Sequence, residues 1–223
     1  MRRRFVAVLV ILLAVTIGVL LWYASDSTVP SINSSSNELS REISFTPPSS
    51  LPFPNNASGF VAPLDRAAER VTKKFFGLKV SPTDSPVSPE RFTGFHTGVD
   101  FEIFDEELNT PVSVQASCGG TLKLKRQATG YGGVVVQECL LGDQPVTVVY
   151  GHLKLSSVTA TVGEYVVAGT RLGLLGAGGS PETDGERKHL HLGIHKGTAV
   201  DLKGYVGSVE DLANWLDPMQ YLP

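Results

Sequence analysis

Between Val99 and His195 the apolar residues recur in short runs that glycines interrupt, and no other feature limits the possible folds as strongly. Short apolar runs with turn residues between them are typical of β-strands. The runs are VDFEIF, VSVQA, TLKLKRQ, VVVQECL, VTVVYGHL, RLGLLG and HLHLGIH. The chain also has 23 glycines and 14 prolines, and only 8% of its residues are aromatic, which favours many turns over a bundle of helices. We therefore expect an all-β domain.

One short helix is expected near the C-terminus, over residues 208–216. Ser208 is a suitable N-cap, with Asp211 three residues later, and the apolar residues that follow have helical spacing. Pro218 ends the pattern. Residues 63–76 have only weak helical periodicity, so we expect a loop there.

Residues 5–23 carry no charge, and as a helix they would be about 28 Å long, close to the ~30 Å hydrocarbon thickness of a bilayer. Three arginines at 2–4 precede this segment and Asp26 follows it. The positive-inside rule then places the N-terminus in the cytoplasm and the rest of the chain outside it. We therefore expect residues 1–23 to form an N-terminal transmembrane helix that anchors a single-pass membrane protein.

Two other interpretations of this apolar segment are less favoured. A cleaved signal peptide usually has a shorter apolar region, of about 7–15 residues. Its best cleavage site here, Ser25-Asp26-Ser27, is poor. A buried core helix is also disfavoured, because the segment is apolar on all sides and a small β-rich domain cannot surround it.

We expect residues 24–58 to form a flexible linker, because most of them are Ser, Thr, Asn or Pro. Such a composition cannot bury enough apolar surface to offset the entropy of ordering. A flexible chain of this length spans roughly 30 Å from end to end, so the substrate is expected close to the membrane. The remaining residues, 59–223, form the expected domain, with its core in 77–196.

The chain has only two cysteines, Cys118 and Cys139, too few for a disulfide-dense scaffold or a four-cysteine zinc site. A hairpin centred between Ala128 and Thr129 would place them directly opposite each other, within reach of a disulfide. Outside the cytoplasm we expect this bridge, with two buried free thiols as the alternative. Either role is structural.

Four of the five histidines have neighbours that point to metal chemistry. His96 precedes Asp100 by four residues, a single residue separates His189 from His191, and His152 follows an apolar run. Imidazole and carboxylate are preferred zinc ligands, and a catalytic zinc usually has three protein ligands and a water. Residues i and i+2 of a strand project to the same face, so the paired histidines can address one point, one on the metal and one on a bound water.

Each of these signals alone has an ordinary interpretation. The His-x-x-x-Asp pair could be a surface ion pair, the His-x-His pair could face solvent, and His152 could be a hydrogen-bonded histidine without further role. Their joint occurrence favours a metal site. His195 shares the strand face of His191 but lies about 13 Å farther along the strand, so we expect it not to be a ligand.

Several segments in this order are specific to one family. They are Gly94-Phe-His96-Thr-Gly-Val-Asp100-Phe, Thr110-Pro-Val, Gly119-Gly, Gly130-Tyr-Gly-Gly, Val149-Tyr-Gly-His152-Leu, Val162-Gly-Glu-Tyr-Val-Val-Ala-Gly169, Leu172-Gly-Leu-Leu-Gly176 and His189-Leu-His191-Leu. With them, residues 77–195 resemble the LytM/lysostaphin-type zinc metallopeptidases, which cut peptide cross-links of bacterial peptidoglycan.

The resemblance implies a small antiparallel β-sandwich or curved sheet with an open groove, of the duplicated hybrid motif type, and one Zn²⁺ per domain. It implies that His96, Asp100 and His191 are the zinc ligands, and that His189 and His152 activate water and stabilise the transition state. The implied protein is a membrane-anchored zinc endopeptidase on the periplasmic or cell-wall side. Its partners would be the peptide stems and cross-bridges of peptidoglycan.

One segment departs from the family. Relatives commonly have a short Gly/Ser turn before the paired histidines, whereas this chain has the longer, charged stretch 178–188. The choice of substrate therefore stays open.

The sequence also allows two alternative functions, a catalytically inactive relative and a carrier domain, but favours neither. A catalytically inactive relative would bind peptidoglycan or activate another hydrolase, but such domains typically lose ligands and all five positions are present here. A lipoyl- or biotinyl-type carrier would need a lysine at the tip of a hairpin, and residues 156–170 contain none. The net charge of -3 gives no basic excess for a nucleic-acid partner, while a protein regulator stays open.

Overall fold

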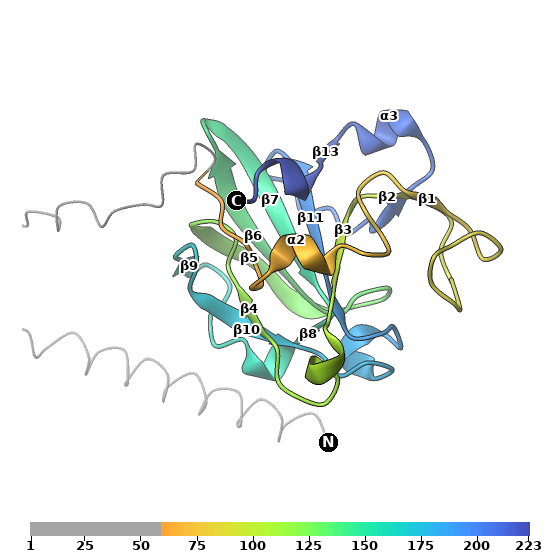
Figure 1. Ribbon diagram of the computed structural model, residues 1–223. Coiled ribbons are helices and arrows are strands. Elements are labelled where there is room, and N and C mark those ends of the chain that lie inside the picture. Colours follow the sequence, from red (N-terminus) through yellow and green to blue (C-terminus); the bar gives the residue numbers. More distant parts are fainter. Residues whose placement is uncertain (1–58) are drawn as a thin grey trace, which may run out of the picture. The chain divides into compact units, whose positions relative to one another are not determined.

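The computed structural model of the protein describes residues 59–223 (Figure 1). The expected membrane helix at 5–23 and the expected linker at 24–58 lie outside these residues and stay predictions. Among the helices of the described part, none has the length and apolarity needed to cross a membrane.

The described part consists mainly of antiparallel β-strands, as expected for an all-β domain. Each of the apolar runs identified in the sequence contains a strand. The strands are β1 (Lys79–Val80), β2 (Gly94–His96), β3 (Gly98–Glu102), β4 (Ser113–Gln115), β5 (Gly120–Ala128), β6 (Gly132–Leu141), β7 (Gln144–Gly151), β8 (Leu153–Lys154), β9 (Tyr165–Val166), β10 (Arg171–Leu175), β11 (His189–Lys196), β12 (Tyr205–Val206) and β13 (Trp215–Leu216). The helices are α2 (Ala67–Arg70) and α3 (Val209–Leu212), with 3-10 turns η1 (Asp105–Glu107), η2 (Leu155–Ser157), η3 (Pro181–Thr183) and η4 (Pro218–Gln220).

Three sheets organise these strands. The main sheet has the order β13-β11-β7-β6-β5-β9, and β3 pairs with β11 on the same side as β13. Two small sheets have the orders β4-β10-β8 and β1-β2-β12. Strand β11 therefore lies between β7 and β3, which are distant from it in the sequence.

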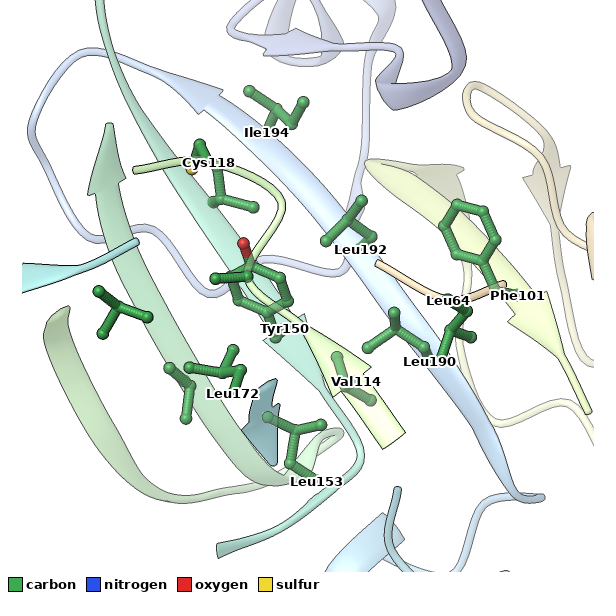
Figure 2. Packing of buried hydrophobic residues seen from close by; sticks show 14 of the residues in the cluster. Leu64, Phe101, Val114, Cys118, Tyr150, Leu153, Leu172, Leu190, Leu192 and Ile194 are labelled. Atoms are coloured by element: carbon green, nitrogen blue, oxygen red, sulfur yellow. The ribbon is translucent and has the colours of Figure 1, made fainter. Parts of the chain in front are cut away.

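The hydrophobic core lies between the main sheet and the β4-β10-β8 sheet (Figure 2). On β11 the core residues are Leu190, Leu192 and Ile194, and Val114 of β4 belongs to the same cluster. Burial of one such side chain contributes about 1.5–3 kcal/mol. Tyr150 is buried at the centre of this core. Its hydroxyl accepts a hydrogen bond from the Ser117 amide (2.8 Å) and donates one to the Gln137 side chain (3.2 Å).

Cys118 and Cys139 are joined by a disulfide, with their Cα atoms 6.2 Å apart. The expected register, however, is wrong, because Cys139 pairs with Gly120 rather than with Cys118. The turn lies later in the sequence than expected, around Gly130, whose φ of 84° is left-handed, and a bulge between Leu122 and Leu124 shifts the register once more. Turn type and bulges set hairpin register, and neither is visible in the apolar pattern.

The C-terminal helix is much shorter than the expected range 208–216. Ser208 does cap it, accepting from the Asp211 amide at 3.1 Å, but the helix ends at Leu212 and residues 215–216 form β13. On one edge of β11, strand β3 pairs only as far as Gly193. Beyond Gly193 the backbone of β11 would lack hydrogen-bond partners on that edge, and β13 pairs with it there. Pairing with the sheet thus overrides local helical preference.

Candidate metal site

Strand alternation brings the paired histidines together with an aspartate. The leucines and the isoleucine of β11 face the core, so His189 and His191 project from the opposite face of the sheet. Antiparallel pairing with β3 places His191 opposite Asp100. His96 ends β2, with only Thr97 between it and the start of β3, and its side chain reaches the same point.

Three atoms from these residues form a compact triangle. His96 Nε2 lies 3.0 Å from His191 Nδ1 and 3.3 Å from Asp100 Oδ1, and His191 Nδ1 lies 3.2 Å from the same oxygen. All three side chains are buried. Zinc bonds of about 2.0–2.1 Å at tetrahedral angles separate the ligand atoms by roughly 3.3–3.4 Å, so this triangle has the size of one face of a zinc site.

A hydrogen bond beside the triangle determines which ring nitrogen of His96 faces its centre. His96 Nδ1 lies 3.3 Å from the carbonyl oxygen of Phe75, which can only accept, so this nitrogen carries the proton and Nε2 presents a lone pair. Burial lowers the pKa of His191 to about 4, so this imidazole is neutral at pH 7, the form that binds a metal. Two imidazoles and a carboxylate around one point are therefore a suitable zinc-binding set.

Asp100 stays ionised in this buried place. Burial opposes its charge, but the neighbouring His189 and His96 outweigh burial and hold the pKa of Asp100 well below its usual range. The carboxylate thus places a negative charge beside the two imidazoles of the triangle.

His189 has a fixed orientation beside the triangle. Its Nδ1 donates to the carbonyl oxygen of Arg187 at 2.9 Å, and its Nε2 lies 3.3 Å from Asp100 Oδ2. The two contacts fix the plane of the ring and direct Nε2 toward the metal-binding side of Asp100.

His152 packs against His189, with ring centroids 4.3 Å apart. Its backbone has a left-handed φ of 63° and is held on both sides, by Tyr131 O (3.1 Å) and by Gly176 N (2.8 Å). Such a conformation costs on the order of 1–3 kcal/mol and is most frequent at functional sites. Its buried Nδ1 has no hydrogen-bond partner among the described residues, and burial together with His189 lowers its pKa well below the usual value.

His195 lies apart from this group, as expected from its distance along the strand. Its ring packs against Trp215 of β13, with centroids 4.8 Å apart. The five residues that the sequence singled out, His96, Asp100, His152, His189 and His191, therefore come together, and His195 does not join them.

Sequence reasoning missed other residues of the site. The pocket at the triangle is also lined by Lys74, Phe92, Gly130, Glu186, Arg187 and Tyr205. Tyr131 is buried, and its hydroxyl lies 3.4 Å from His191 Nε2. Two signals could have found some of them, because Arg187 shares the i, i+2 parity of the paired histidines that follow it, and Gly130 and Tyr131 belong to one of the family segments.

The segment between β1 and β2 contacts the loop before β11. Arg91 donates to the Glu186 carboxylate at 2.9 Å and to the carbonyl oxygen of Asp184 at 2.8 Å. The ring of Phe92 stacks on that of Tyr205, with centroids 5.1 Å apart. These contacts build the wall of the pocket from segments that are far apart in the sequence.

No curated protein matches the chain significantly. Similar solved structures include LytU, with 22% identity and a TM-score of 0.45 over 68% of this chain and 83% of LytU. The catalytic domain of the antimicrobial peptidase lysostaphin from Staphylococcus simulans has 21% identity and a TM-score of 0.45, covering 70% of this chain and 96% of that domain. A zinc-containing peptidase from Vibrio cholerae has 21% identity and a TM-score of 0.40, covering 61% of this chain and 36% of that one.

Residues 94–202 match the family model of Peptidase family M23. This range includes the strands β2, β3 and β11 that hold the triangle and the segment with His152. The chain therefore contains a LytM-type domain of peptidase family M23.

Proposed function

We propose that this domain is a zinc-dependent endopeptidase that hydrolyses peptide cross-links of bacterial peptidoglycan. The observation that carries the proposal is the triangle of His96 Nε2, Asp100 Oδ1 and His191 Nδ1, with sides of 3.0–3.3 Å. Membership of peptidase family M23 supports the class of reaction.

His96, Asp100 and His191 are the residues that would hold zinc. When bound there, zinc would supply a Lewis acid that polarises the scissile carbonyl and makes water a better nucleophile. The other roles belong to side chains of this protein.

His189 is the proposed general base. Because its Nδ1 donates to Arg187 O, its Nε2 is the atom that accepts the proton of the attacking water and later delivers it to the leaving amine. His152 is neutral and packs against His189, so it is placed to donate a hydrogen bond to the negative charge that develops on the carbonyl oxygen.

The expected membrane anchor would determine where the proposed hydrolysis takes place. With residues 5–23 in the membrane and 24–58 as a tether, the domain would act outside the cytoplasm, on peptidoglycan close to the membrane surface. The uncharged segment and the three arginines before it support this part of the proposal.

The test compares His189→Ala, His191→Ala and His195→Ala with the wild-type protein. Purified full-length protein in detergent is loaded with zinc and incubated with purified sacculi, and the released muropeptides are identified by mass spectrometry. His191→Ala is expected to lose both zinc and cleavage. His189→Ala should keep much of the metal while cleavage falls by about 10²–10⁴-fold, the usual contribution of a general base.

His195→Ala is the matched control, since it removes an imidazole from the same face of β11 outside the pocket. It should digest sacculi as the wild type does. Undiminished cleavage by both His189→Ala and His191→Ala would contradict the assignment. Wild-type protein that binds zinc and releases no muropeptides would instead be a peptidoglycan-binding domain or an activator of another hydrolase.

A further inference from the structure

Arg187 joins two carboxylates of β3 at the edge of the candidate metal site. Its Nη2 donates to Asp100 Oδ2 at 2.8 Å. Its Nε lies 3.0 Å from each oxygen of Glu102, and Nη2 also contacts Glu102 Oε1. The Arg187 side chain is 21% exposed and the two carboxylates are 10% exposed or less, so water screens these contacts only weakly.

The two oxygens of Asp100 have different surroundings. Oδ1 faces the two imidazoles of the triangle, at 3.3 Å from His96 Nε2 and 3.2 Å from His191 Nδ1. Oδ2 faces Arg187 and His189. Without Arg187, rotation about the Cβ–Cγ bond of Asp100 would exchange the two oxygens or place both on the metal side.

We infer that Arg187 is a positioning residue that holds Asp100 Oδ2, so that the carboxylate presents only Oδ1 to the metal. This inference rests on the proposed function, because it concerns the same zinc site. It assigns a role to the charged segment 178–188, which departs from the family pattern.

Strand geometry makes the arrangement rigid. Asp100 and Glu102 are two residues apart on β3 and therefore project to the same face. Glu102 pairs across the sheet with His189, only two residues after Arg187. The start of β11 thus brings the guanidinium next to Glu102 and within hydrogen-bond distance of Asp100.

Glu102 also balances the charge of Arg187. An unpaired guanidinium beside a metal ligand would repel the metal, whereas a guanidinium paired with Glu102 leaves the charge of Asp100 available to the cation. Arginine can hold two carboxylates at once through its planar fork, and the compact ammonium of lysine cannot reproduce that geometry.

The experiment measures zinc affinity by competition with a chromophoric chelator, and the visible spectrum of the Co²⁺-loaded protein. The variants are Arg187→Met, Arg187→Lys and Glu102→Gln in the full-length protein, with thermal unfolding of each metal-free variant to verify folding. Arg187→Met should weaken zinc binding by about 10–100-fold and change the Co²⁺ spectrum, as removal of partners that orient metal ligands typically does. Arg187→Lys and Glu102→Gln should weaken it in the same direction.

Lys73→Met is the matched control. Lys73 contacts the same Glu102 Oε2 at 3.3 Å but its side chain is 43% exposed and it makes no contact with Asp100. It should bind zinc with the affinity and Co²⁺ spectrum of the wild type.

Zinc affinity within twofold of wild type in Arg187→Met, with an unchanged Co²⁺ spectrum, would overturn the inference while leaving the proposed function intact. If that variant does not fold, the same result in Arg187→Lys and Glu102→Gln overturns it. A rise in KM for sacculi or model peptides with unchanged zinc affinity would also overturn it, because Arg187 would then bind substrate. A wild-type protein without zinc affinity would overturn the proposed function and the inference together.

Discussion

At the scale of single residues, the site depends on which nitrogen of each imidazole carries a proton. Backbone carbonyls decide this at two positions, since Phe75 O lies next to His96 Nδ1 and Arg187 O next to His189 Nδ1. His96 Nε2 therefore faces His191 and Asp100 Oδ1, and His189 Nε2 faces Asp100 Oδ2. Sequence spacing identifies the histidines, but it does not reveal the carbonyls that orient them, because those come from segments with no motif of their own.

Gly98 shows how closely the backbone approaches the site. A Cβ atom at this position would lie 2.8 Å from Cε1 and Nε2 of His191 and would collide with the carbonyl oxygen of Leu192. Gly98→Ala should therefore displace the His191 ring, weaken zinc binding, and destabilise the fold by about 1–3 kcal/mol, the usual cost of overpacking. Isothermal titration calorimetry measures the change in zinc binding, and urea unfolding measures the change in stability.

Gly207→Ala is the control for this change, since nothing lies within 4 Å of a Cβ atom at Gly207. Its zinc affinity and stability should match the wild type. If Gly98→Ala bound zinc with wild-type affinity, the ring of His191 could not lie against Gly98 as a zinc ligand.

At the scale of elements, the strands were predictable and their partners were less so. The alternation of HLHLGIH identifies β11 and its two faces, because burial of one face imposes a period of two. Residues 215–216 have helical spacing with the preceding helix but pair as β13, because the free edge of β11 needs a partner. Residues 67–70, expected as loop, form α2.

Helix α2 is held by a buried ion pair. The fully buried guanidinium of Arg70 donates to both oxygens of Glu107, at 2.7 and 2.9 Å, and Glu107 also accepts from the Phe104 amide at 2.9 Å. The hydrogen bonds from Arg70 lower the pKa of Glu107 below its usual value of 4.5, although partial burial opposes this. The pair thus joins α2 to the η1 turn that follows β3.

Glu107→Gln should lower the free energy of unfolding at pH 7 by about 1–3 kcal/mol, because it removes charged hydrogen bonds to a buried guanidinium. Since the folded-state pKa of Glu107 is the lower one, its stabilisation is complete above about pH 4.5 and is lost as the pH falls through the folded value. Urea unfolding at several pH values should show a difference between wild type and variant that is largest near neutrality and shrinks toward pH 3.

Glu106→Gln is the control, since this neighbouring side chain is exposed. It should unfold like the wild type at every pH. A pH-independent effect of Glu107→Gln would contradict the ion-pair explanation.

At the scale of the whole molecule, local patterns indicated the all-β class and the group of residues at the site, and long-range contacts determined the rest. Cys118 and Cys139 form the expected disulfide, although the register from which it was predicted is wrong, because the hairpin turns around Gly130 and β5 contains a bulge. Arg187 was missed because its role depends on Glu102, which is 85 residues away in the sequence. The anchor and the linker stay predictions.

The central claim is that His96, Asp100 and His191 bind one zinc ion that keeps an open coordination position. Anomalous diffraction at the zinc absorption edge, from crystals of the zinc-loaded protein, tests this most directly. The account predicts one anomalous peak about 2.0–2.2 Å from His96 Nε2, Asp100 Oδ1 and His191 Nδ1, with the fourth position held by water. A peak bound by other residues, no peak at this site, or a protein atom in the fourth position would contradict it.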